Sequence, residues 1–149
     1  MREYINAAAL KDMILCADAA LRANIQVLND LNVFPVPDGD TGTNMGLTME
    51  KAATELRKKN FDTVSAVADC VASALLRGAR GNSGVILSLL FRGISKQLKG
   101  AETADAKIFA AALHNLVAGF IYTGNTEAID TFLIPGNDLL KSAALSAIG

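Results

Sequence analysis

Apolar residues recur every three to four positions along most of this chain, and this spacing constrains its fold more than any other feature. Such a period places the apolar residues on one face of a helix. The segments predicted to be helical are residues 6–31, about 43–58, 63–78 and 83–98, and a fifth that follows Thr103. The alternation typical of strands does not stand out, and short connections make consecutive helices antiparallel neighbours. The pattern therefore predicts an all-α antiparallel helical bundle.

One face of each predicted helix should form the core. Its expected members are Leu10, Ile14, Ala17, Leu21, Ile25, Leu28, Met45, Met49, Ala52, Leu56, Val64, Val67, Val71, Leu75, Ile86, Leu90, Ile94, Phe109, Leu113, Leu116 and Phe120. Asp62 or Thr63 is predicted to cap the third helix, and Thr103 the fifth. Residues 126–149 carry a weaker signal, which predicts one or two short helices broken at Pro135-Gly136.

The bulk composition narrows the class of protein. A length of 149 residues suits a single domain with one core. The formal net charge of −1 does not indicate binding to nucleic acid or to an anionic membrane. No apolar run reaches the length of a membrane span. Cys16 and Cys70 fall within helical segments, and the N-terminus does not read as a signal peptide. We therefore expect reduced, buried thiols in a cytoplasmic protein.

The first chemically dense segment is the connection at residues 32–45, Asn-Val-Phe-Pro-Val-Pro-Asp-Gly-Asp-Thr-Gly-Thr-Asn-Met. It places Asp38 and Asp40 two residues apart, and hydroxyl and amide oxygens follow them. Two carboxylates about 4–5 Å apart repel by roughly 1 kcal/mol in water, and the first cation downstream is Lys51. Hard oxygen ligands of this kind are selected by Mg²⁺ or Ca²⁺, so the loop predicts a divalent cation site. A plain turn is the alternative interpretation.

The second such segment is Gly78-Ala79-Arg80-Gly81-Asn82-Ser83-Gly84, with glycines at intervals of three. Glycines let backbone N–H groups approach a phosphate, and the start of the next helix adds a partial positive charge. The segment therefore predicts an anion site. It is not a Walker loop, because no Gly-Lys-Ser/Thr follows. The alternative is a helix C-cap at Gly78 and an N-cap at Asn82 or Ser83.

Helix counting brings the two segments together. Antiparallel neighbours place both connections at one end of the bundle, where a loop around Gly124-Asn125 would join them. Together they predict a metal–phosphate site of the kind used for nucleotide binding and phosphoryl transfer. Helix capping is the alternative role of Thr43 and Asn44. The sole histidine, His114, is expected to be packed or partly exposed rather than catalytic, and zinc is not expected.

At these residues the sequence closely resembles a known family. Residues 32–45 and the run Arg-Gly-Ala-Arg-Gly-Asn-Ser-Gly-Val-Ile-Leu-Ser at 77–88 look like the ATP-binding domain of bacterial fatty acid kinases. That domain is related to the nucleotide-binding subunit of dihydroxyacetone kinases. The resemblance covers about residues 1–113. It implies an eight-helix antiparallel barrel that binds ATP or ADP and two Mg²⁺ ions at one end.

The resemblance also implies roles for individual residues. Asp38 and Asp40 would be the Mg²⁺ ligands and, because they hold the ions, also the catalytic carboxylates. The residues implied to touch metal or nucleotide are Thr41, Thr43 and Asn44, and those implied to touch the phosphates are Gly81, Asn82, Ser83 and Gly84. The acceptor would be a fatty acid presented by a separate DegV-like lipid-binding protein. Asn32 stands in the region where dihydroxyacetone kinases carry a third aspartate, as a fatty-acid-kinase-like sequence would.

The sequence also departs from this family. After about Leu113 it lacks the expected Pro-Val-Glu-Gly-Thr-like stretch, for which Thr123-Gly124-Asn125-Thr126 is a loose stand-in. We therefore expect residues 1–149 to form a single domain that is divergent or truncated after residue 113. The open side of an incomplete barrel would favour oligomerisation, for example as a homodimer. The alternatives are a dihydroxyacetone kinase nucleotide subunit, a catalytically incomplete nucleotide-binding fragment and a helical interaction module.

Overall fold

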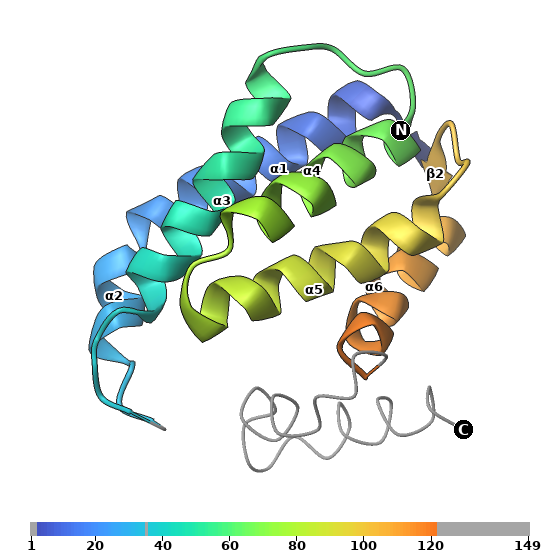
Figure 1. The fold of residues 1–149 in the computed structure, drawn as a ribbon. Helices are drawn as coiled ribbons and strands as arrows, with labels where there is room; N and C mark the ends of the chain where they lie inside the picture. Colours follow the sequence, from blue (N-terminus) through green and yellow to red (C-terminus); the bar gives the residue numbers. More distant parts are fainter. Residues whose placement is uncertain (1–2, 35, 122–149) are drawn as a thin grey trace.

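Six helices form the fold within the part of the chain that the computed structural model describes, residues 3–34 and 36–121 (Figure 1). In chain order the elements are β1 (Tyr4–Ile5), α1 (Ala7–Ala23), α2 (Ile25–Asp30), α3 (Thr41–Arg57), α4 (Val64–Gly78), α5 (Gly81–Leu98), β2 (Ala104–Asp105) and α6 (Ala106–Ile121). The predicted all-α class is confirmed, and the eight-helix barrel stays a prediction. Within the described residues, none of the helices combines the length and apolar character needed to cross a membrane.

Several expectations fall beyond this part of the chain. The predicted loop at Gly124-Asn125 and the predicted short helices within residues 126–149 lie outside the described residues. The same holds for the side chains of Leu116 and Phe120, which were expected to face the core.

The first predicted helix, residues 6–31, is wrong as a single element, because the structure divides it at Asn24 into α1 and α2. Asn24 has φ −114° and ψ 11°, and its side-chain amide donates to the carbonyl oxygen of Ala20 (2.7 Å). Asparagine side chains compete in this way for backbone groups and so interrupt helices. The short α2 that follows packs against α3.

Side-chain caps fix the starts of α4 and α6. The expected cap at Thr63 is confirmed, since its Oγ1 accepts the backbone N–H of Ala66 (3.0 Å). The expected cap at Thr103 is wrong, because the carboxylate of Asp105 accepts the N–H of Ile108 (2.8 Å) instead. Asp105 also belongs to β2, which pairs antiparallel with β1 and ties the start of the chain to the start of α6. Two residues per strand are too few to produce a recognisable alternating pattern.

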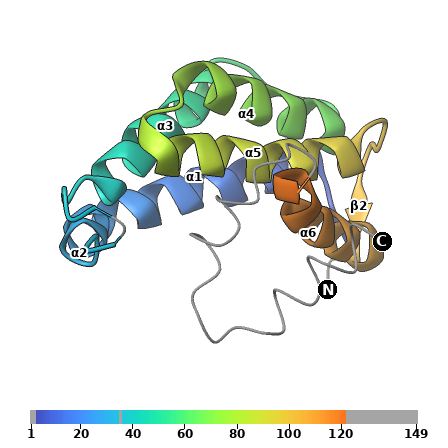
Figure 2. The same cartoon turned by 60° about the horizontal axis from the view of Figure 1, so that its bottom comes forward.

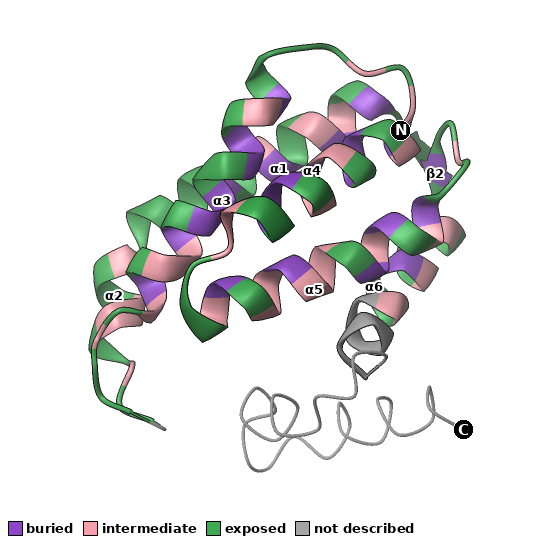
Figure 3. Ribbon diagram, viewed as in Figure 1, coloured by how far each residue is buried: buried purple, intermediate pink, exposed green. Residues whose placement is uncertain are grey.

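The core lies between α1, α3, α4 and α5, whose buried faces are turned toward one another (Figure 3). Its buried apolar residues are Ala7, Leu10, Ile14, Met49, Ala52, Ala53, Leu56, Val64, Val67, Ala68, Val71, Ala74, Leu75, Leu98, Ala104 and Ala112. All four residues expected inward on α4 are among them. This agrees with the position of α4, which packs against both α3 and α5.

The expected core face of α5 is only partly correct. Ile86, Leu90 and Ile94 are half-buried, whereas Gly84 and Ser88 are buried. Small side chains at these two positions let α5 lie close to the neighbouring helices, and close packing rewards that approach. The apolar stripe of α5 is therefore displaced from the helix face that meets α3.

Three residues expected to be buried are exposed: Ala17, Leu113 and Cys16. The buried stripe of α1 continues from Ile14 to Asp18 instead of Ala17, which places a carboxylate where the pattern suggested alanine. Within the described residues both cysteines are free. Cys70 is half-buried, and desolvation raises the pKa of its thiol.

The carboxylate of Asp18 is fully buried and lies between two arginines. Its Oδ2 contacts Nη2 of Arg22, one turn along α1, and lies 3.5 Å from Nη2 of Arg57 on α3. Hydrogen bonding to Asp18 raises the pKa of Arg22. Oδ1 of Asp18 has no hydrogen-bond partner. The buried charge is therefore compensated by cations that reach it from both helices.

These two cations should matter more for stability than the carboxylate itself. The double variant Arg22→Gln/Arg57→Gln leaves a buried negative charge uncompensated, which costs more than replacing Asp18 by neutral asparagine. We expect the double variant to unfold at a lower urea concentration than Asp18→Asn, as followed by circular dichroism. Lys58→Gln, which removes only an exposed ion pair to Glu55, should stay near the wild-type midpoint. A lower midpoint for Asp18→Asn than for the double variant would contradict the prediction.

Candidate functional site

The acidic connection and the glycine connection lie at the same end of the bundle. In Figures 1 and 2 the segment between α2 and α3 and the segment between α4 and α5 both lie at this end, and the strand pair lies at the opposite end. This is the arrangement that antiparallel helices predict. The contacts between the two segments show how closely they are joined.

One buried hydroxyl joins α3 to the glycine connection. The side chain of Thr48 is fully buried, and its Oγ1 donates to the carbonyl oxygen of Asn44 (2.7 Å) and accepts the backbone N–H of Arg80 (3.0 Å). Both capacities of the hydroxyl are therefore used. Thr48 was not among the predicted site residues. Its signal in the sequence is a polar residue within the buried stripe of α3, one position before Met49.

Glycines allow the start of α5 to lie directly against α3. A Cβ at Gly84 would lie 2.4 Å from Oγ1 of Thr48, and a Cβ at Gly81 would lie 2.5 Å from Nδ2 of Asn44. Gly81 also has φ +61°, which favours glycine over any other residue. Gly81 and Asn44 were predicted separately, from different segments, and the structure places them in contact.

The start of α5 has no side-chain cap. Its N-cap residue is Arg80, which is extended at φ −122° and makes no capping hydrogen bond. The alternative in which Asn82 or Ser83 caps the helix is wrong, since both lie inside α5, and the residue that caps the end of α4 is Ala79 instead of Gly78. The N–H groups of the first turn therefore point out of α5 without a side-chain acceptor, the arrangement that binds anions in many proteins.

The acidic connection is organised by Asn32. Its Oδ1 accepts the backbone N–H groups of Asp40 (3.0 Å) and Thr41 (3.2 Å), and its Nδ2 donates to the carbonyl oxygen of Val36 (3.1 Å). An aspartate at this position could accept the first two bonds but could not donate the third. The amide therefore folds the loop back toward the start of α3.

Both predicted carboxylates are exposed. Asp40 occupies the N-cap position of α3, yet its side chain makes no capping hydrogen bond, and Asp38 precedes it by two residues. No group of three or more histidine, cysteine, aspartate or glutamate side chains suited to a metal occurs among the described residues. The protein donors available here are thus two carboxylates, a number that suits Mg²⁺ when phosphate oxygens and water complete its six ligands.

The capping role considered for Thr43 and Asn44 is wrong, because α3 begins at Thr41 and both lie within its first turns. Instead, Thr43 is held by Asn29 of α2: Nδ2 of Asn29 donates to Oγ1 of Thr43, and Oδ1 of Asn29 accepts the N–H of Thr43, each at 3.0 Å. The hydroxyl of Thr43 keeps its own hydrogen to donate elsewhere. α2 and the start of α3 therefore form one hydrogen-bonded unit.

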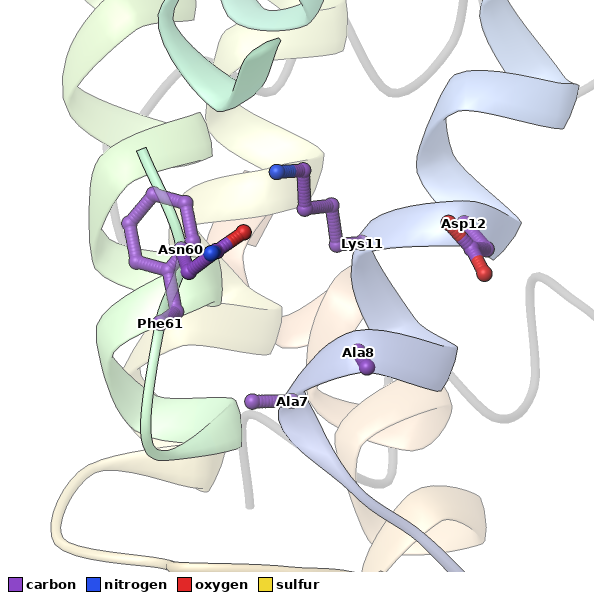
Figure 4. A pocket seen from close by; sticks show the side chains of 6 residues that line it. All are labelled: Ala7, Ala8, Lys11, Asp12, Asn60 and Phe61. Carbon is purple, nitrogen blue, oxygen red and sulfur yellow. The ribbon is translucent and has the colours of Figure 1, made fainter. Parts of the chain in front are cut away.

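A pocket of about 200 Å³ lies away from this site (Figure 4). Its lining residues are Ala7, Ala8, Lys11, Asp12, Asn60 and Phe61. They belong to the start of α1 and the connection after α3, so roughly the length of α3, about 25 Å, separates them from the acidic connection. None of the predicted site residues lines this pocket. His114, which was expected to be packed or partly exposed, is exposed on α6.

Comparisons with known proteins show which sequences this chain is similar to. A family model described as DAK2 domain matches residues 35–135, which include the glycine segment and the acidic segment from residue 35 onward. Protein YloV of Bacillus subtilis (strain 168) is 43% identical over 137 residues, covering 91% of this chain and 25% of that protein. Uncharacterized proteins of Staphylococcus aureus strains USA300 and NCTC 8325 are each 42% identical over 110 residues, covering 74% of this chain and 20% of each relative. The chain thus spans a fifth to a quarter of their length.

Thr48 should stabilise the contact between α3 and the start of α5. Thr48→Val keeps the shape of the side chain and removes both hydrogen bonds, which leaves the N–H of Arg80 without its partner. We expect a loss of about 1–2 kcal/mol in the free energy of unfolding, measured by urea denaturation. Thr54→Val, on the exposed side of the same helix, should change it by less than about 0.5 kcal/mol. Equal effects of the two substitutions would contradict the prediction.

Proposed function

This chain belongs to the DAK2 domain family, whose members resemble the L subunit of dihydroxyacetone kinase, and we propose from this that it binds ATP with Mg²⁺. In the proposed reaction it transfers the γ-phosphoryl group to an acceptor held by a separate protein. The observation that carries the proposal is the contact between the two predicted segments. Thr48 bonds the connection before α5 to α3, and Gly81 lies against Asn44, so carboxylates and an uncapped helix start belong to one end of the bundle.

Each predicted residue has a role in this proposal that its surroundings permit. Asp38 and Asp40 are exposed, and the side chain of Asp40 makes no capping hydrogen bond, so both carboxylates would hold the Mg²⁺ ions. The N–H groups of Gly81, Asn82 and Ser83 at the start of α5 are offered to the phosphates. The N–H of Gly84 donates to the carbonyl oxygen of Arg80 (3.0 Å), so Gly84 contributes by its small size at the contact with Thr48. The hydroxyl of Thr43 donates to metal-bound water or phosphate, and Thr41 and Asn44 line the same end of α3.

The mechanism is direct transfer. When bound, Mg²⁺ neutralises the phosphate charge that would otherwise repel Asp38 and Asp40. The N–H groups at the start of α5 fix the phosphates and stabilise the charge on the transferred group. An acceptor oxygen then bonds to the γ-phosphorus, the bond to the oxygen between the β- and γ-phosphorus breaks, and ADP leaves. Positioning and charge stabilisation suffice for this chemistry, which needs no covalent nucleophile from the protein.

We further propose a fatty acid carboxylate as the acceptor, presented by a DegV-like lipid-binding protein, so that the product is an acyl phosphate. The support is the resemblance of both segments to fatty acid kinases and the role of Asn32. Its amide makes three hydrogen bonds within the loop, one of which an aspartate could not make. Dihydroxyacetone is the second candidate acceptor, and the DAK2 family match favours it. The chain covers only 25% of the length of protein YloV. That the chain is active without further domains is therefore a separate proposal.

Removing the two carboxylate charges should abolish the metal-dependent part of nucleotide binding. We expect Asp38→Asn/Asp40→Asn to weaken binding of ATP in the presence of Mg²⁺ by at least about tenfold, measured by isothermal titration calorimetry, because ligand changes cost at least as much as changes around the ligands. Asp62→Asn, an exposed aspartate in the connection after α3, is the matched control and should bind like wild type. Absence of binding by the wild-type chain, or equal binding by the double variant, would contradict nucleotide binding at this site.

The acceptor can be identified by phosphotransfer. The chain is supplied with γ-labelled ATP, Mg²⁺ and either a fatty-acid-loaded DegV-like protein or dihydroxyacetone with its own binding subunit. We expect label to appear in an acyl phosphate, which hydroxylamine cleaves. Label in dihydroxyacetone phosphate would support the second candidate. If neither acceptor is labelled although ATP binds, the chain is an incomplete nucleotide-binding fragment.

A further inference from the structure

Large apolar side chains are exposed on α2 and on the connection between α2 and α3, which also carries the two carboxylates. These residues, called here the apolar tip, are Val27, Leu31, Val33, Phe34 and Val36, each more than half exposed. Phe34 is 80% exposed, the highest value among the exposed large apolar side chains in the described part of the chain. The segment projects beyond the ends of the helices (Figure 1), and its surface is almost wholly exposed (Figure 3). Single exposed apolar residues are ordinary, but a contiguous group of them marks an interaction surface.

The apolar tip is linked to the predicted metal site by hydrogen bonds. The side chain of Asn32, in the middle of the tip, holds the carbonyl oxygen of Val36 on one side and the N–H of Asp40 on the other. Asn29 in turn holds Thr43, so α2, the tip and the start of α3 form one unit. A molecule that docks on the tip is thereby positioned against the carboxylates.

The charge around the tip indicates what kind of molecule fits it. Residues 25–40, which form α2 and the connection after it, contain three acidic side chains, Asp30, Asp38 and Asp40, and no lysine or arginine. An anionic lipid surface would be repelled by this segment, and a second copy of the chain would bring the same negative charge to a symmetric contact. A complementary surface is apolar at its centre and bordered by cations.

From this combination we propose that the apolar tip docks the acceptor-carrying protein, through an apolar recess on that protein rimmed by lysine or arginine. The inference rests on the proposed function, in which the acceptor arrives on a separate protein. Docking at the tip would bring the acceptor oxygen to the end of the bundle where the γ-phosphoryl group is held. The apolar residues would supply affinity, and the surrounding charges would supply orientation and speed of association.

The first test removes the largest side chain of the tip. Phe34→Gln is compared with Met13→Gln, which replaces an exposed apolar residue on α1 outside the tip. A fatty-acid-loaded DegV-like protein from the same genome is the probe, measured on a biosensor without nucleotide and as the acceptor in phosphotransfer. We expect Phe34→Gln to raise both the dissociation constant and the KM for this protein by about tenfold or more, the loss typical of a central interface residue. Its kcat and its binding of ATP with Mg²⁺ should stay within about twofold of wild type, and Met13→Gln should change none of these values.

The second test concerns charge. Val36→Lys and Val36→Glu alter the same exposed side chain with opposite signs. Against a cation-rimmed partner, Val36→Lys should weaken docking more than Val36→Glu does, and the difference should shrink as salt is raised. Docking on anionic lipid would reverse this order, as read from cosedimentation with vesicles of phosphatidylglycerol and phosphatidylcholine.

Several results would overturn the docking proposal. They are failure of the wild-type chain to bind the probe, unchanged binding by Phe34→Gln, the reversed order of the Val36 variants, or a wild-type dimer that Phe34→Gln makes monomeric in sedimentation equilibrium. Failure of the proposed function has a different signature. If the wild-type chain does not bind ATP, the proposed function is contradicted. The docking proposal is then still tested by the biosensor, because that measurement is made without nucleotide.

Discussion

The hydroxyl of Thr48 is the interaction on which the architecture of this end of the molecule depends. It is buried, it uses both its donor and its acceptor capacity, and its partners belong to two segments more than thirty residues apart. Losing the bond to Arg80 would leave an unpaired N–H before the start of α5. For a buried group, the free-energy cost of such a loss exceeds the small net gain from forming the bond. Gly84 completes the arrangement, since any side chain there would occupy the space of this hydroxyl.

Asparagine side chains fix several helix ends and connections, and each does so through a different set of hydrogen bonds of its amide group. Asn24 ends α1, Asn29 holds α2 to α3, Asn32 folds the acidic connection, and Asn6 caps α1 by accepting the N–H of Ala9 (2.8 Å). An amide both donates and accepts, so it can join backbone groups of opposite polarity without adding charge. Near two carboxylates this matters, because an added negative charge would repel them.

Sequence periodicity predicted the helices well where side-chain size and burial agree, as on α4, and antiparallel topology correctly placed the two site segments together. It failed where a specific polar contact outweighed the pattern. The amide of Asn24 divided a long helix, the carboxylate of Asp18 took the place expected for Ala17, and close approach at Gly84 turned the apolar stripe of α5 aside. Such contacts join residues distant in sequence, so a local pattern cannot reveal them. The roles assigned to the site residues themselves stay predictions.

The uncapped start of α5 has a consequence for the energetics of the domain. A helix whose own sequence supplies no side-chain acceptor must leave its first N–H groups to water, so its first turn is free to fray. Any anion bound there acts as the missing cap and stabilises the folded state in proportion to the logarithm of its concentration. The order of the first turn of α5, and through the Arg80 N–H bond the order of α3, would then report occupancy of the site as slower amide hydrogen exchange.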